Sequence, residues 1–341
     1  SNSNALSLGN GSSVLNITGT NTISGPVALA LGRLDVDENA SISGAITHTA
    51  SSSIDIASGK TLTYSGAGVS LGAYTLTLLG GGTLSNTNAL SLGNGSSVLN
   101  MTGTNTISGP VALALGRLDV DENASISGAI THTASSSIDI ASGKTLTYSG
   151  AGVSLGAYTL TLLGGGTFSN SNALTLGNAD SVLRITGSNT VSLVTVSTGL
   201  SSGISITESS TISTLTIGAS TPLAIASGKT LSGSVTLNSS GTLQLTLTGT
   251  LGASLVMNEG RLDIDEDSTI SGAITHTASS SIDIASGKAL TYSGAGVSLG
   301  AYTLTLFGRW DILEHECIEF REWFECMEHN GERTRSVVQL L

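Results

Sequence analysis

The chain has 341 residues and a net charge of −12, with charged residues at 11% and aromatic residues at 4% of the composition. The 12 basic residues form no patch, so we expect no nucleic-acid binding through phosphate neutralisation. Polar residues interrupt every apolar stretch, so we also expect no transmembrane segment. The sequence opens inside a repeat without a recognisable signal peptide, and we interpret it as a fragment or mature piece of a longer protein.

The expected elements are short strands bounded by glycine, asparagine and serine. In Ser53–Ile56, Ile54 and Ile56 point to one side while Asp55 points to the other, which is the period of a half-buried strand. Strand starts recur about every 8–10 residues, and no helical period is present before Gly308, so the sequence predicts an all-β fold. Examples in chain order are Ala5–Leu8, Val14–Thr18, Leu34–Asp37, Ser53–Ala57, Thr61–Tyr64, Val69–Leu71 and Thr75–Leu78.

The strands belong to a long internal repeat. Residues 1–84 and 85–168 differ only at Ser3/Thr87, Ile17/Met101 and Leu84/Phe168. A third copy, residues 169–308, diverges at first, contains an added segment and returns to the same text at Leu262. We call the 84-residue repeat the super-repeat; such a period is typical of stacked repeat proteins.

A solenoid explains the added segment better than a closed sandwich does. Each solenoid coil contacts only its neighbours, so whole coils can be inserted without disrupting the rest. Coils of about 20–21 residues divide the super-repeat into four coils and the added segment, about 60 residues, into three. At about 4.8 Å per coil, residues 1–308 are predicted to form a single β-solenoid of roughly 15 coils and about 70 Å.

The segment IASGKTLTYSGAGVSLGAYTLTLLGGGTL, residues 56–84, carries a family resemblance. It resembles the passenger repeats of bacterial autotransporters and related filamentous surface adhesins. The resemblance implies a right-handed parallel β-helix, an extracellular or cell-surface location, and host-cell, matrix or glycan surfaces as partners.

Residues 309–341 differ abruptly from the repeats and hold both tryptophans and both cysteines, Cys317 and Cys326. Suppose that the second and third bases of each tail codon are the first and second bases of a codon of another repeat. The codons of Gly81 and Gly82 then give Arg309 and Trp310. The same reading accounts for every residue from Arg309 to Gly331 except Met327. We therefore predict that the tail is a frameshifted fourth repeat; the alternative is a helical cap of the solenoid end.

Carboxylate pairs recur in Leu34–Glu38 and its copies and are weak calcium candidates, because calcium takes 6–8 oxygen ligands. Copies four coils apart cannot share one ion, and the spacing fits no established calcium loop, so a solvated polar edge is the favoured interpretation. The candidates are Asp35, Asp37, Asp119, Asp121, Asp263 and Asp265.

Catalysis is not expected, because an active site needs a unique constellation and these residues repeat. His48, His132 and His276 stand in Thr-His-Thr without a second histidine or cysteine nearby, and alternation with Ile46 favours an inward His48. Each copy of Asp55 is expected to stand alone. A β-helix carbohydrate-active enzyme is nevertheless kept as an alternative, and no cofactor is expected.

Threonine pairs suggest one more alternative, since flat threonine arrays on β-solenoids bind ice. The pairs are Thr47 and Thr49, Thr61 and Thr63, and Thr75 and Thr77. A coil of about 20 residues should place these pairs on different faces and break the array. The favoured function is therefore a secreted or surface-displayed structural stalk or adhesin region without catalysis. Open coil ends also suggest end-to-end self-association.

Overall fold

The computed structural model describes residues 4–246, 248–295 and 297–308. The predicted frameshifted tail and the alternative cap both lie outside these residues. The described chain is all-β, with parallel strands and no helix, so the expected β-solenoid is confirmed. It divides into two compact units, unit 1 (Ser1–Val194) and unit 2 (Thr195–Leu341).

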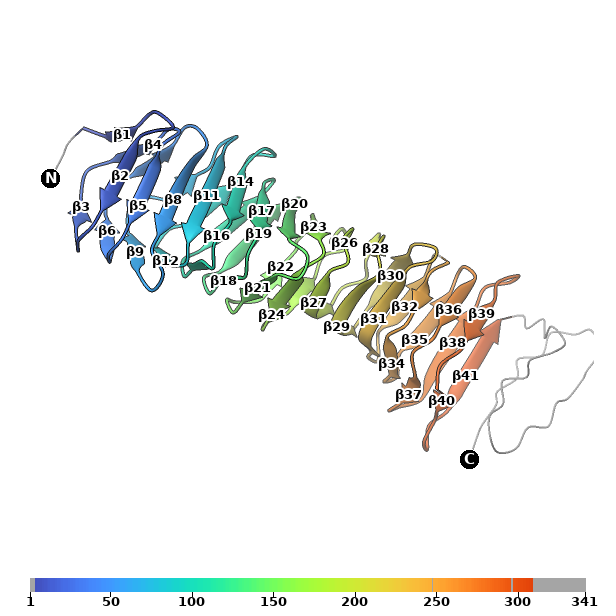
Figure 1. The fold of residues 1–341 in the computed structure, drawn as a ribbon. Helices are drawn as coiled ribbons and strands as arrows, with labels where there is room; N and C mark the ends of the chain where they lie inside the picture. Colours follow the sequence, from blue (N-terminus) through green and yellow to red (C-terminus); the bar gives the residue numbers. More distant parts are fainter. Residues whose placement is uncertain (1–3, 247, 296, 309–341) are drawn as a thin grey trace, which may run out of the picture. The chain divides into compact units, whose positions relative to one another are not determined.

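In unit 1 each turn places one strand on each of three faces, and Figure 1 shows neighbouring strands of successive turns side by side. Face 1 consists of β2 (Val14–Ile17), β5 (Arg33–Val36), β8 (Ser52–Ile56), β11 (Thr75–Gly80), β14 (Val98–Met101), β17 (Arg117–Val120), β20 (Ser136–Ile140), β23 (Thr159–Gly164) and β26 (Val182–Ile185).

Face 2 of unit 1 consists of β3 (Thr22–Ile23), β6 (Ala40–Ile42), β9 (Thr61–Tyr64), β12 (Thr83–Asn86), β15 (Thr106–Ile107), β18 (Ala124–Ile126), β21 (Thr145–Tyr148), β24 (Thr167–Asn170) and the start of β27 (Thr190–Val196). Face 3 consists of β1 (Leu6–Leu8), β4 (Val27–Leu29), β7 (Ile46–His48), β10 (Val69–Ser70), β13 (Leu90–Leu92), β16 (Val111–Ala114), β19 (Ile130–Ala134), β22 (Val153–Ser154) and β25 (Leu174–Leu176).

Unit 2 has the same plan, with two longer strands that serve faces 2 and 3 together, β29 (Ser210–Ile217) and β31 (Thr230–Leu237). Its face 1 consists of β28 (Gly203–Ile206), β30 (Ser220–Ile225), β32 (Thr242–Leu245), β35 (Arg261–Ile264), β38 (Ser280–Ile284) and β41 (Leu304–Gly308). The remaining strands are β33 (Thr250–Leu251), β36 (Ser268–Ile270) and β39 (Leu290–Tyr292) on face 2, and β34 (Ser254–Met257), β37 (Ile274–His276) and β40 (Val297–Ser298) on face 3.

The turn length follows from the strand register and is not constant. One column of face 1 contains Leu15, Leu34, Ile54, Leu78 and Met101. The steps along this column are longer after Ile54 than before it. Four turns carry the column from Leu15 to Met101, whereas the sequence copy of Leu15 is Leu99. The register therefore drifts by two positions per super-repeat.

The core is a stack of inward aliphatic side chains. Leu34, Leu62 and Leu118 have no exposed surface, and the alternating burial of the strands leaves most polar residues outside. Each buried aliphatic side chain stabilises the fold by about 1.5–3 kcal/mol, and the contribution recurs on every turn. Residues 169–308 hold seven face-1 strands, three more than residues 1–84, so the added segment forms whole turns.

The seven example strands expected from sequence are all present, with ends shifted by at most two residues. The turn corners carry features that alternation does not encode. Leu31 and Leu115 precede face 1 with φ of 87° and 94°, a left-handed conformation that disfavours side chains with a Cβ. Both leucines are more than half exposed, so this strain is not offset by burial.

Candidate functional site

Face 2 of unit 1 presents a continuous surface of hydroxyl groups. From β3 to β24, every outward position on its strands is serine or threonine. The residues are Thr22, Ser41, Thr61, Thr63, Thr83, Ser85, Thr106, Ser125, Thr145, Thr147, Thr167 and Ser169. We call this surface the hydroxyl face; no charged side chain stands at these strand positions.

The hydroxyl groups are also in register from turn to turn. One column runs through six consecutive turns and contains Thr61, Thr83, Thr106, Ser125, Thr147 and Ser169. Thr22 and Ser41 on neighbouring turns bring their Oγ atoms within 3.3 Å. In unit 2 a similar column contains Thr230, Thr250, Thr269 and Thr291. Neighbouring residues of a column lie on adjacent strands about 4.8 Å apart, and neighbouring outward residues of one strand lie about 6.6 Å apart.

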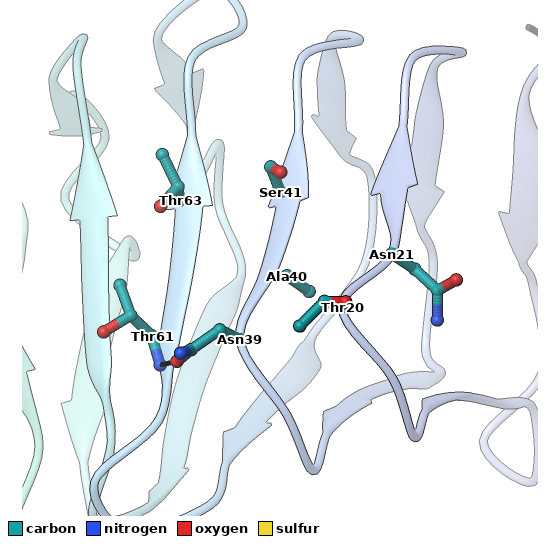
Figure 2. A pocket seen from close by; sticks show the side chains of 7 residues that line it. All are labelled: Thr20, Asn21, Asn39, Ala40, Ser41, Thr61 and Thr63. Atoms are coloured by element: carbon teal, nitrogen blue, oxygen red, sulfur yellow. Dashed lines mark hydrogen bonds between the residues drawn. The ribbon is translucent and has the colours of Figure 1, made fainter.

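A shallow hollow opens on the hydroxyl face near its first turns (Figure 2). The backbone N–H of Thr61 donates to Asn39 Oδ1 at 2.9 Å, which fixes the corner between β5 and β6 against the next turn. Asn123 makes the same contact with Thr145 one super-repeat later. The hollow is lined by Thr20, Asn21, Asn39, Ala40, Ser41, Thr61 and Thr63. Its wall is thus hydroxyl and amide, suited to hydrogen bonding with neutral polar groups.

Face 1 carries charged groups on neighbouring turns. Arg33 contacts Asp35 on its own strand at 2.7 Å and Asp55 on the next turn at 3.6 Å. Burial raises the pKa of Asp55, and the Asp35 carboxylate raises that pKa further, while Arg33 opposes both effects. The expectation that Asp55 stands alone is wrong, because its partners lie one turn away.

The arginine arrangement recurs with the repeats. Arg117 contacts Asp119 and Asp139 at 2.7 and 3.4 Å, and Arg261 contacts Asp263 and Asp283 at 3.4 and 2.5 Å. A second set of ion pairs lies at the corners between faces 1 and 2. These pairs are Lys60–Glu38, Lys144–Glu122, Lys229–Glu208 and Lys288–Glu266.

The calcium candidates fall into two groups. Asp35, Asp119 and Asp263 lie outward on face 1, where each pairs with an arginine. Asp37, Asp121 and Asp265 follow those strands at exposed corner positions. Within the described ranges, no group of three or more histidine, cysteine or acidic residues could hold a metal ion. Arginine thus neutralises the carboxylates of Asp35, Asp119 and Asp263, and a calcium site stays a prediction.

The threonine pairs proposed for an ice-binding array lie on three different faces. Thr47 stands on β7 of face 3, Thr61 and Thr63 on β9 of face 2, and Thr75 and Thr77 on β11 of face 1, with Thr49 just after β7. The in-register column on face 2 was missed. It links Thr61 to Thr83 and Thr106 on the next two turns. This alignment follows from the strand register, because the turns differ in length.

The three repeated histidines point into the solenoid from face 3, as alternation predicts for His48. His48 and His132 are 7% exposed, and their Nδ1 atoms lie 3.1 and 3.0 Å from the carbonyl oxygens of Leu71 and Leu155. A carbonyl only accepts, so Nδ1 carries the proton and donates it. Burial lowers the pKa of both imidazoles, and the Nε2 atoms are buried without a hydrogen-bond partner.

The third copy differs in its partner, because His276 Nδ1 lies 2.5 Å from Ser280 Oγ. Burial lowers the pKa of His276 as well. All three histidines are therefore held neutral inside the turns, which fits a structural role.

No protein-family model, no curated protein and no solved structure matches the chain. None of the described residues forms a helix long and apolar enough to cross a membrane.

Proposed function

We propose that the chain is a structural stalk region of a secreted or surface-displayed adhesin, and that its hydroxyl face provides the adhesive surface. One observation carries the proposal: on face 2, the outward positions of the strands from β3 to β24 are serine or threonine without exception. A repeated neutral surface suits many weak hydrogen bonds to hydroxyl-rich surfaces such as glycans. Many weak contacts in parallel bind by avidity.

The repeat architecture supports the stalk part of the proposal. Each turn packs only on its neighbours, so stability and reach grow with the number of turns. Deleting residues 85–168 joins Leu84 to Ser169, a junction equivalent to Leu84–Ser85. We expect the shortened protein to keep its β-sheet circular dichroism and to lose four turns, about 19 Å along the stack, in small-angle scattering. Loss of β structure on this deletion contradicts a modular stalk.

The adhesive part is tested with the full chain coupled to beads on a polysaccharide film. Replacing Thr83, Thr106 and Ser125 with alanine removes three neighbouring hydroxyls from face 2. We expect several-fold lower retention under flow, because each lost contact weakens every bound chain. The matched control replaces Ser53, Thr77 and Ser137 on face 1 with alanine and should retain binding. Equal retention by both variants, or none by the parent chain, contradicts the adhesive face.

Ice binding is the second candidate, favoured by the in-register column of hydroxyls on a face without charge. A regular array can order water into a lattice, and threonine adds a methyl group to each hydroxyl. Ser125 and Ser169 lack that methyl within the six-residue column, which is why we place adhesion first.

Thermal hysteresis of the full chain tests this candidate. If ice binding is the function, Thr106→Tyr should abolish the hysteresis because a bulky ring interrupts the column. Ser137→Tyr on face 1 is the control and should leave the hysteresis intact. A parent chain that neither shapes ice crystals nor lowers the freezing point removes ice binding from consideration.

The carbohydrate-active enzyme ranks third, because Asp35 and Asp55 are already paired with Arg33. A reducing-sugar assay on soluble polysaccharides, repeated with Asp55→Asn, tests it. Product that forms with the parent chain and disappears in the variant supports an enzyme.

A further inference from the structure

A row of exposed apolar side chains follows the corner between faces 3 and 1 of unit 1. Apart from Val14, the strongly exposed large apolar side chains among the described residues of unit 1 all lie at this corner. Leu31 lies between β4 and β5, and Tyr74 lies between β10 and β11. Leu115 lies between β16 and β17, and Tyr158 lies between β22 and β23. We call these four residues the apolar row.

The apolar row uses every second turn of the solenoid. Neighbouring members of the row are two turns apart, which corresponds to about 9.6 Å along the stack. The corner on the turn between Leu31 and Tyr74 ends in Ser51, and the corner on the turn between Tyr74 and Leu115 ends in Ser97. Apolar and hydroxyl corners therefore alternate along this part of unit 1.

The tyrosine rings of the row are seated on buried neighbours. The ring of Tyr74 meets the buried imidazole of His48 edge to face, with 6.0 Å between the ring centroids and 73° between the planes. Gly72 lies against the same ring, because a Cβ there would be 3.4 Å from Tyr74 Cδ2. Tyr158 has the same seat on His132, at 6.1 Å and 72°. Both tyrosines are 39% exposed with turns on either side, so their exposure belongs to the corner itself.

Hydrogen bonds from the neighbouring turns fix the tyrosine corners. Ser51 Oγ on the preceding turn accepts the N–H of Thr75 at 3.1 Å. Ser97 Oγ on the following turn donates to the Gly72 carbonyl oxygen. In the second copy the corresponding contacts are Ser135 with Thr159 and Ser181 with Gly156. The rings are thus preorganised, which lowers the entropic cost of binding a ligand.

The two leucines of the row are exposed at a cost to the fold. Leu31 and Leu115 have φ of 87° and 94°, and they are 53% and 52% exposed. A left-handed backbone is strained at a residue with a Cβ, and these side chains gain little burial in return. Retained strain of this kind is typical of functional sites. A contact with a ligand outside the chain would offset it.

The form of the row favours a long and thin ligand. A second protein chain would need about 800 Å² of matching surface on each partner. The row is one side chain wide and is interrupted by serine corners, so it offers apolar contacts at regular points instead of a continuous patch. An extended polysaccharide fits such points, because each sugar ring has an apolar C–H face and a rim of hydroxyls.

We propose that the apolar row binds an extended β-linked glucan, with every second sugar ring packed on one side chain of the row. Consecutive sugars in such a chain are turned over relative to each other, so the same ring face returns after two sugars. That repeat is close in length to two turns of the solenoid. The intervening sugars then lie over the serine corners. This site is separate from the hydroxyl face, which lies on face 2.

Co-sedimentation of the full chain with microcrystalline cellulose tests the proposal. Granular starch, an α-linked glucan of the same sugar whose chains coil, is measured in parallel. We expect the parent chain to bind cellulose several-fold more strongly than starch, because only the extended glucan matches the spacing of the row. A parent chain that binds both equally, or does not bind cellulose, overturns the proposal.

The tyrosines are tested by replacing both rings. Tyr74→Ala combined with Tyr158→Ala should weaken cellulose binding about tenfold, because aromatic anchors contribute much of the binding energy at such sites. Tyr74→Phe combined with Tyr158→Phe keeps the rings and is the matched control, which should bind like the parent. An alanine variant that binds cellulose like the parent overturns the proposal.

The leucines allow binding to be separated from stability. Leu31→Gly combined with Leu115→Gly relieves both left-handed backbones and removes two contacts of the row. We expect several-fold weaker cellulose binding by a protein that melts no lower than the parent. A lower melting temperature with unchanged cellulose binding would give the leucines a structural role and overturn the row as a binding site.

Two further measurements identify the other possible outcomes. A variant with Thr83, Thr106 and Ser125 replaced by alanine should keep the preference for cellulose over starch, whatever its total retention. If that variant loses the preference and the tyrosine variant keeps it, the hydroxyl face binds the glucan and the row does not. If ultracentrifugation shows self-association that the tyrosine variant loses, while the parent does not bind cellulose, the row joins two copies and the proposal fails.

Discussion

In unit 1, face 1 carries Arg117, Asp119 and Asp139 on neighbouring turns, whereas the strands of face 2 carry only serine and threonine outside. The inward positions of both faces are mostly aliphatic, and face 2 also buries Tyr64, Tyr148 and Phe168. The inward residues set the fold, and the outward residues are then free to differ from face to face. The solenoid thereby separates two surface chemistries that alternate every few residues in sequence.

The largest expected effect comes from the corner that keeps the two faces in register. Gly103 lies between β14 on face 1 and β15 on face 2, where a Cβ would approach the Gly80 carbonyl oxygen to 1.8 Å. We expect Gly103→Ala to lower the free energy of unfolding by about 3 kcal/mol, because the backbone must shift. Urea denaturation measures the loss. A Gly103→Ala protein as stable as Gly11→Ala, where a Cβ meets nothing within 4 Å, contradicts the close packing of turns.

Mild acid should lower the stability of the fold through the three buried histidines of face 3. The pKa values of His48, His132 and His276 are lowered by burial, so the unfolded chain binds protons that the folded chain excludes. Stability is therefore full above the unfolded pKa of about 6.5 and falls as the pH drops below it. Melting temperatures at pH 7.5 and pH 5 measure this change. Replacing all three histidines with glutamine should flatten the dependence, whatever the absolute stability of that variant.

Two aspartates on face 1 and one at its corner respond in the opposite sense. Burial raises the pKa of Asp55, Asp119 and Asp265, so the folded chain binds protons before the unfolded chain does as the pH falls. Protonation of these groups therefore favours the folded state in the acid range, close to the ordinary aspartate pKa of about 3.9. In the histidine-free variant we expect a small rise in melting temperature between pH 6 and pH 4. A continued fall there contradicts this account of face 1.

A stabilising change is available at the corner before face 1. Leu115 has φ of 94° and is 52% exposed, so its side chain contributes strain and little burial. Leu115→Gly removes the steric penalty, and we expect about 1 kcal/mol of added stability after the entropic cost of glycine. Urea denaturation checks the gain. Leu113→Gly on the buried side of β16 is the matched control and should destabilise the protein.

The smallest expected effect is a difference between the two faces in how salt changes the stability of their variants. Arg117 is 40% exposed while it contacts Asp119 and Asp139, and exposed ion pairs contribute less than about 1 kcal/mol. Arg117→Gln should cost at most that amount at low salt, and less at 1 M sodium chloride, because salt screens exposed charges. Thr106→Val on face 2 should show no such salt dependence. Equal salt responses from the two variants contradict the separation of charge between the faces.

Sequence predicted the fold because alternation is local. Ile54 and Ile56 indicate which side of β8 points inward, within a single short strand. The same two-residue alternation, applied from Ile46, predicts that His48 points inward. It missed the partners of Asp55 and of Thr83 because those lie one turn away. The step along a column changes from turn to turn, so a single average coil length cannot align them. It also missed the strained Leu115, since nothing in its neighbours demands a left-handed backbone.

In unit 1 the strand register shifts by two residues with each super-repeat. After four turns the same sequence therefore returns displaced by about 6.6 Å along the strand. A single favourable residue would therefore leave its column after one super-repeat and be replaced by the outward residue two places away. Only a face that uses the same chemistry at every outward position keeps an unbroken ladder, and in unit 1 the strands of face 2 from β3 to β24 meet that condition. The adhesion we propose would use this ladder, because a long ligand on face 2 would meet hydroxyl groups on every turn, whereas on face 1 it would meet charged, amide and aliphatic groups in succession.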